Sequence, residues 1–193
     1  MVKRVGLGGA WNIPNALTLL RIVLVPVLVG LVLYHHFGAA AAVFLVAGLT
    51  DALDGMLARI LDQRTTLGRY LDPLADKLLL VMSFLTLSFV GSIPIWITII
   101  VVSRDVIISM GALIVHLLRE QVNILPSWMG KAATVMQLLF VFGTLIALNK
   151  PMMSAVALEA VLVLMLGLTV ASGIHYVMRG IRMLSGAGND HPA

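Results

Sequence analysis

Four aspartates stand close together in an otherwise strongly apolar chain. Asp51 and Asp54 are three residues apart, and Asp72 and Asp76 are four apart. On an α-helix, residues at these spacings share one face, so each pair can direct its carboxylates to the same side. A short polar connection, residues 62–66, separates the two pairs. The pattern predicts a helical hairpin, residues 51–76, with a carboxylate cluster at its turn.

Carboxylates that converge beside apolar helices predict a metal site. Their mutual repulsion would be costly unless cations held them together. Hard oxygen ligands with no His or Cys nearby favour Mg²⁺ or Mn²⁺, and the cluster could hold two ions. The structural alternative is that the acids form ion pairs with neighbouring cations, Asp54 with Arg59 or Asp76 with Lys77.

Small residues and a cation accompany the acids. Gly55 and Ala58 follow the first pair and Gly68 precedes the second, where little side-chain bulk would let a ligand approach the backbone. Close helix packing is the alternative explanation for these three. Arg59 can present a planar cationic fork to a phosphate. Because Mg²⁺ commonly binds substrate phosphates, the combination predicts a phosphoanhydride ligand.

The composition is that of an integral membrane protein. Of the 193 residues, 60% are hydrophobic and 11% charged, and the mean hydropathy is +1.04. A spanning helix needs about 20 apolar residues, so the length suits roughly six spans in a single membrane domain, residues 1–193. The absence of cysteine excludes disulfides, thiolate ligands and a cysteine nucleophile.

An all-α fold with six transmembrane helices is therefore expected. The predicted helices are residues 16–34, 38–61, 68–90, 93–118, 127–148 and 152–177. The first acidic pair stands near the end of the second helix and the other pair near the start of the third. Both polar ends should therefore meet at one membrane face.

The basic residues predict the orientation of these helices. Nine of the 13 would lie on the face shared by both termini and the acidic cluster: Lys3, Arg4, Arg59, Arg64, Arg69, Arg119, Lys131, Arg179 and Arg182. The opposite connections contain only Lys150. Positive charge marks the cytoplasmic side, so the termini and the cluster are expected at the cytoplasmic face of a bacterial inner or equivalent membrane. The net charge of +4 then indicates contact with anionic lipid heads rather than nucleic acid.

The hairpin also carries a family resemblance. Its pattern, D-x2-D-G-x2-A-R-x8-G-x3-D-x3-D, resembles the signature of the CDP-alcohol phosphotransferase family at every fixed position. The resemblance implies a six-helix membrane fold, transfer of a phosphatidyl or related group from a CDP-linked donor to an alcohol with release of CMP, and a homodimer. It also implies roles for the motif residues: metal binding by Asp51, Asp54, Asp72 and Asp76, proton removal by Asp76 as general base, and CDP binding by Asp54, Gly55, Ala58, Arg59 and Gly68.

Segments outside the hairpin indicate the acceptor alcohol. Residues 12–21 (NIPNALTLLR), residues 126–137 (PSWMGKAATVMQ) and the triplet at 103–105 are similar to segments of the phosphatidylglycerophosphate synthases and cardiolipin synthases of this family. The donor would be CDP-diacylglycerol and the acceptor glycerol 3-phosphate, whose phosphate needs a basic pocket. Arg21, Arg104 and Lys131 are the candidates.

Two alternatives are also compatible with the sequence. Phosphatidylglycerophosphate synthases commonly have a further Arg soon after the triplet, and residues 106–113 contain none, so cardiolipin synthesis from phosphatidylglycerol is a close competitor. A divalent-cation transporter is the alternative of another class, because acids within membranes also mark ion pathways. It predicts acids spread across the membrane depth, for which Glu159 alone is weak support.

Overall fold

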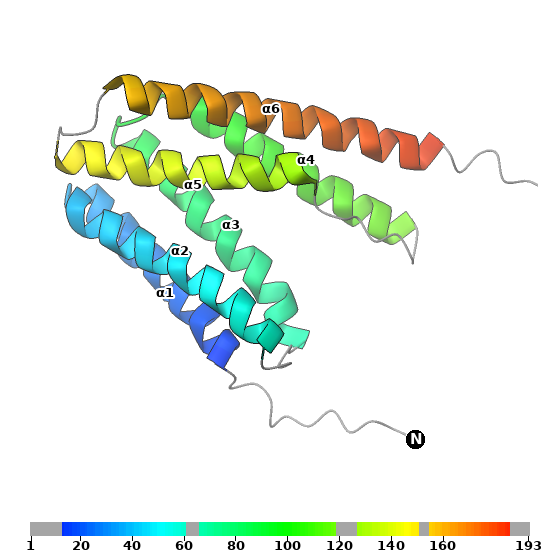
Figure 1. The fold of residues 1–193 in the computed structure, drawn as a ribbon, viewed down its shortest axis with the longest axis horizontal. Helices are drawn as coiled ribbons and strands as arrows, with labels where there is room; N and C mark the ends of the chain where they lie inside the picture. The colour runs from blue at the N-terminus through cyan, green and yellow to red at the C-terminus, as the bar shows by residue number, and fades with distance from the viewer. Residues whose placement is uncertain (1–12, 61–65, 119–126, 151–154, 186–193) are drawn as a thin grey trace, which may run out of the picture. The chain divides into compact units, whose positions relative to one another are not determined.

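The chain forms an all-helical structure. The computed structural model describes residues 13–60, 66–118, 127–150 and 155–185, with side chains for 16–51, 75, 77–111, 127–150 and 156–180. Within those ranges there are six α-helices and no strand (Figure 1). The helices are α1 (Ile13–Leu33), α2 (Phe37–Ile60), α3 (Thr66–Phe89), α4 (Ile95–Leu118), α5 (Trp128–Asn149) and α6 (Ala155–Ser185).

The helix boundaries follow the predicted ones closely except at the C-terminal end. There α6 continues to Ser185, whereas the apolar pattern predicted an end at residue 177. Arg179 and Arg182 end the apolar stretch, and for that reason the sequence predicts that the helix ends there. Arginine is a good helix former, however, so a helix can continue beyond its apolar part.

Two tight turns connect consecutive helices. After α1, the His36 N–H donates to Leu31 O at 2.8 Å and the His35 N–H to Val32 O at 3.0 Å. This is the hydrogen-bond pattern of a Schellman motif, which requires a left-handed residue, and His35 adopts φ 59°. Gly91 takes the same position after α3, with φ 72°. The turn after α1 brings α2 back alongside it.

The chain divides into two compact groups of helices, and each is described by itself. In the first, α1 packs against both α2 and α3. The start of α1, the end of α2 and the start of α3 lie at the same end of this group (Figure 1). The two halves of the acidic motif are therefore brought to one end, as the hairpin prediction required. That the chain is one domain stays a prediction.

The buried and exposed faces of α1 differ in polarity near the acidic end. The buried face consists of Thr18, Arg21, Val25, Leu28 and Val32, a spacing of alternately three and four residues. The exposed face carries apolar side chains, among them Leu19, Val23 and Val27. An apolar exposed face opposite a packed one is what a lipid environment favours.

The second group contains α4, the first part of α5 and α6, with α4 packed against α6. Its buried residues include the apolar Val101 and Met165. Polar residues are buried here as well, notably Arg104, Gln137 and Ser172. Buried polar groups need hydrogen-bond partners, and Arg104 finds its partners within this group.

Three helices in the described part of the chain are long and apolar enough to cross a membrane. They are Ala16–Leu33, Trp128–Asn149 and Val156–Gly180. Two further apolar stretches, Phe37–Asp51 and Lys77–Phe89, are shorter. The protein is thus an integral membrane protein, while the count of six spans stays a prediction.

Candidate active site

The acidic motif occupies the ends of two helices that meet at one end of the first group. Asp51 and Asp54 lie near the end of α2, and Asp72 and Asp76 lie in the first part of α3. Both pairs are in regular helix, so the spacings of three and four residues place the members of each pair on one side of their helix. The backbone arrangement is the one that a shared carboxylate cluster needs.

Asp51 is held by an arginine from α1. Arg21 Nη1 lies 3.1 Å from Asp51 Oδ1, and the Arg21 side chain is fully buried whereas that of Asp51 is 44% exposed. The arginine therefore approaches the carboxylate from the protein interior. A carboxylate has two oxygens with several lone-pair directions, so this contact leaves Asp51 able to bind a cation. The sequence predicts Arg21 in the acceptor pocket and gives no sign of its contact with Asp51.

The other members of the motif lie beyond the described side chains. This applies to Asp54, Gly55, Ala58, Arg59, Gly68, Asp72 and Asp76, of which only the helical backbone is described. Among the side chains that the structure describes, no group of three or more potential metal ligands comes together. The metal cluster and the CDP site remain predictions, supported by helix positions and by the chemistry of the donor set: carboxylate oxygens are the ligands that Mg²⁺ prefers.

Arg104 is the centre of a buried polar network in the second group. Its Nη1 donates to Asp105 Oδ1 at 2.7 Å, its Nε to Ser172 Oγ on α6 at 3.1 Å, and its Nη2 to the Gly130 carbonyl on α5 at 3.4 Å. Charged groups are costly to bury unless they are paired and hydrogen-bonded, and Arg104 is both. This residue therefore joins three helices, a role that its place in the Ser-Arg-Asp triplet did not indicate.

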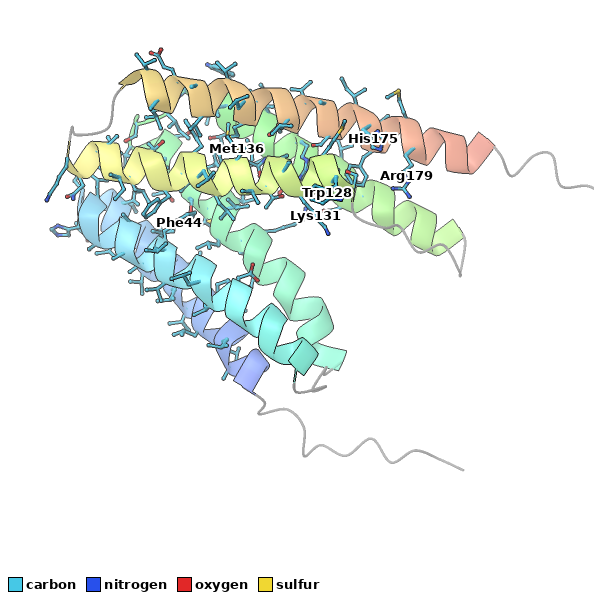
Figure 2. All side chains as sticks on the ribbon, viewed as in Figure 1. Phe44, Trp128, Lys131, Met136, His175 and Arg179 are labelled. Carbon is cyan, nitrogen blue, oxygen red and sulfur yellow. The ribbon has the colours of Figure 1, made fainter. Side chains whose placement is uncertain are left out.

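The start of α5 is a capped helix end. Ser127 Oγ accepts from the Gly130 N–H at 3.1 Å, which satisfies one of the otherwise unpaired donors of a helix start. The Ser127 N–H in turn donates to Tyr176 Oη on α6 at 2.8 Å. Lys131 completes this turn, and its exposed side chain extends from α5 away from α6 (Figure 2). Of the three basic residues predicted for the acceptor pocket, Arg21 and Arg104 are buried and Lys131 is exposed.

Sequence reasoning did not find Ser172 or Tyr176. Both are polar residues in the last predicted span, where a polar group must find its hydrogen-bond partner within the protein. Their polarity within an apolar stretch is the only indication that the sequence gives. No fixed spacing connects them with Arg104 or Ser127, because the partners lie on other helices. Their contacts depend on how α6 packs.

A family model described as CDP-alcohol phosphatidyltransferase matches residues 11–171. The chain belongs to this family. The matched stretch contains the whole acidic motif together with Arg21, Arg104 and Lys131. Tyr176 and Ser172 lie beyond its end. Membership accounts for the family resemblance of the hairpin and makes the protein an enzyme of the CDP-alcohol phosphatidyltransferase type.

Curated relatives of this chain have names that are more specific than the family description. A probable phosphatidylglycerophosphate synthase of Mycobacterium tuberculosis is 36% identical over 183 residues, which cover 91% of this chain and 84% of the relative. A CDP-diacylglycerol–glycerol-3-phosphate 3-phosphatidyltransferase of Haemophilus influenzae is 37% identical over 176 residues, 86% of this chain and 92% of the relative. A CMP-forming cardiolipin synthase of Homo sapiens is 46% identical over 99 residues, 51% of this chain and 33% of the relative.

Proposed function

We propose that this protein transfers the phosphatidyl group of CDP-diacylglycerol to glycerol 3-phosphate, producing phosphatidylglycerophosphate and CMP. The observation that carries the proposal is that the two halves of the family motif meet at one end of α1 to α3, with Asp51 held by Arg21. The choice of substrates is supported by the two relatives with matching names, to which the chain is similar over most of both lengths.

The proposed reaction is a direct displacement. The hydroxyl oxygen of glycerol 3-phosphate attacks the phosphorus of the phosphatidyl group, and the bond from that phosphorus to the oxygen bridging to CMP breaks. CMP leaves with the bonding electrons, and the Asp76 carboxylate takes the hydroxyl proton. No covalent intermediate with the protein is needed, so the residues chiefly have to bind and orient the two substrates.

The predicted ligand set suits Mg²⁺ or Mn²⁺, with two ions held by Asp51, Asp54, Asp72 and Asp76. When bound, the ions would neutralise charge on the diphosphate and on the departing CMP. Gly55, Ala58, Arg59 and Gly68, together with Asp54, are proposed to line the CDP site. Arg21 would keep the Asp51 carboxylate in one orientation, since groups that hydrogen-bond to a metal ligand fix its direction.

Lys131 is proposed to bind the phosphate of glycerol 3-phosphate. Its ammonium group is exposed, so it is available to an anionic ligand, and a charge-assisted hydrogen bond to phosphate is among the stronger ones. Arg21 and Arg104 remain predicted to add positive charge to the acceptor pocket. Both are buried and already contact protein groups, so their share in direct binding should be smaller.

The membrane side and the assembly state are also proposals. The distribution of basic residues supports a cytoplasmic location for the acidic end of α2 and α3 and for both termini. The acyl chains of the donor would then lie in the bilayer while its nucleotide reaches that end. A homodimer is proposed from the family resemblance alone. Membership of an enzyme family decides against the cation-transporter alternative.

Cardiolipin synthesis from phosphatidylglycerol is the second candidate. The observation in its favour is the 46% identity to the human cardiolipin synthase, confined to about half of this chain. One assay distinguishes the two acceptors. The purified protein is given CDP-diacylglycerol and Mg²⁺ together with glycerol 3-phosphate, phosphatidylglycerol, inositol phosphate or serine, and CMP release is measured. We expect release to depend on glycerol 3-phosphate; release with phosphatidylglycerol instead would support the second candidate, and none with any acceptor would overturn the proposed function.

A further inference from the structure

The first turn of α5 is held by two side chains from other helices of the second group. Tyr176 on α6 accepts the Ser127 N–H through its hydroxyl at 2.8 Å. Arg104 on α4 donates from Nη2 to the Gly130 carbonyl at 3.4 Å. Within the turn, Ser127 Oγ accepts from the Gly130 N–H at 3.1 Å, and Ser127 O accepts from the Lys131 N–H at 3.1 Å. The backbone that carries Lys131 is therefore tied to both neighbouring helices.

Gly130 makes the close approach of these side chains possible. A Cβ at this position would lie 3.1 Å from Tyr176 Cε2, 3.2 Å from the Tyr176 hydroxyl oxygen and 3.3 Å from Arg104 Nη2. These separations are tighter than ordinary van der Waals contacts, so with alanine here the tyrosine or the arginine would have to shift by a few tenths of an ångström. Glycine thus allows the closest contact between the turn and Tyr176.

The tyrosine hydroxyl performs a specific task here. Ser127 immediately precedes α5, and the N–H groups at a helix start have no partner within the helix. Such a donor needs a partner from another part of the protein or from water. Tyr176, which is 49 positions after Ser127 in the sequence, supplies this partner through its hydroxyl oxygen. The bond therefore fixes the start of α5 against α6.

We propose that Tyr176 is a positioning residue for acceptor binding, which acts by fixing the turn from which Lys131 extends. The Lys131 side chain points away from α6, so the tyrosine acts through the backbone and does not share the ligand (Figure 2). The inference depends on the proposed function in one respect: Lys131 must bind the acceptor phosphate. Tyr176 lies outside the stretch matched by the family model.

The first test is the variant Tyr176→Phe, which removes only the hydroxyl group. Tyr34→Phe, at a tyrosine that is 78% exposed after the end of α1, is the matched control. Loss of one hydrogen bond that orients a binding group should raise the KM for glycerol 3-phosphate about three- to tenfold. We expect the KM for CDP-diacylglycerol and kcat to stay within about twofold of the unaltered protein. Unchanged acceptor KM, or equal increases for both substrates, would contradict the inference.

A second measurement reports the turn itself and requires no activity. The chain has no cysteine, so Trp128→Cys creates a single labelling site at a residue that is 88% exposed. A nitroxide attached there should become more mobile when Tyr176→Phe is added and not when Tyr34→Phe is added. Gly130→Ala should have the same effect, because its Cβ displaces the tyrosine ring. This variant also provides the test if Tyr176→Phe fails to fold.

The two measurements separate the inference from the proposed function. Increased label mobility with a higher KM for glycerol 3-phosphate supports both. Increased mobility with no change in acceptor KM means that the turn is fixed as described but that Lys131 does not bind the acceptor, which overturns the positioning role. Unchanged mobility in both Tyr176→Phe and Gly130→Ala overturns the inference whatever the kinetics.

Discussion

Arg21 and Asp51 form an ion pair between α1 and α2, with Arg21 Nη1 3.1 Å from Asp51 Oδ1. The arginine is fully buried and the aspartate is 44% exposed, so the pair extends from the interior to the acidic end of the first group. A buried cation of this kind is costly unless it is paired, and here its partner is a predicted metal ligand. The contact joins α1 to the predicted metal site of the hairpin.

Replacing Arg21 should therefore weaken metal-dependent activity. For Arg21→Gln, we expect the Mg²⁺ concentration that gives half-maximal CMP release to rise about 10- to 100-fold, the usual effect of removing a group that orients a metal ligand. Lys150→Gln, which removes an exposed positive charge, is the control. If the Mg²⁺ dependence equals that of the control, Arg21 does not contribute to metal binding.

The carboxylate cluster predicts a strong effect of Asp72→Asn. The amide keeps the size of the side chain but lacks the negative charge that holds a divalent cation, so CMP release should fall at least about 100-fold. Asp62→Asn, at an aspartate outside the motif, should retain activity. Both proteins should give the same elution profile in size-exclusion chromatography, and an active Asp72→Asn protein would remove this residue from the ligand set.

The proposed contact of Lys131 with the acceptor predicts a selective kinetic change. Lys131→Gln should raise the KM for glycerol 3-phosphate about 10- to 100-fold, the value of one charge-assisted hydrogen bond, with little change in the KM for CDP-diacylglycerol. Steady-state CMP release with each substrate varied in turn measures both constants. An equal change for donor and acceptor would point to a general disturbance of the second group instead.

The network around Arg104 predicts a loss of stability. Asp105→Asn leaves the buried guanidinium without its charged partner at 2.7 Å, which should cost roughly 3 kcal/mol. Ser103→Ala serves as the control, because Ser103 is the exposed residue immediately before Arg104. Thermal unfolding in detergent should show a lower midpoint for Asp105→Asn alone. Coinciding midpoints of the two variants would show that the pair contributes nothing to stability.

Helices could be predicted well because their signals are local. Apolar stretches interrupted by polar connections place five of the six helices within a few residues of their observed bounds. The exception is the end of α6, where arginines end the apolar stretch but not the helix. The acidic motif could likewise be read from spacing, since residues three or four apart on a helix share a side regardless of what surrounds it.

Contacts between helices could not be predicted in this way. The sequence predicts Arg21 in the acceptor pocket, and its partner Asp51 is 30 positions along the chain. Arg104 has the same predicted role, and its partner Ser172 is 68 positions away. No sequence spacing specifies such pairs, because they depend on how each helix is rotated about its axis and shifted along it when the two helices pack.

By itself, the sequence determined the helical membrane character of this protein, the positions of its helices apart from the end of α6, and the motif that identifies its family, since all three follow from local composition and spacing. Only the tertiary structure decided that Arg21 holds Asp51 and that Tyr176 and Arg104 hold the start of α5. The physical reason is that a side chain's partner is set by the packing of whole helices, which brings distant residues together at distances that local patterns do not encode.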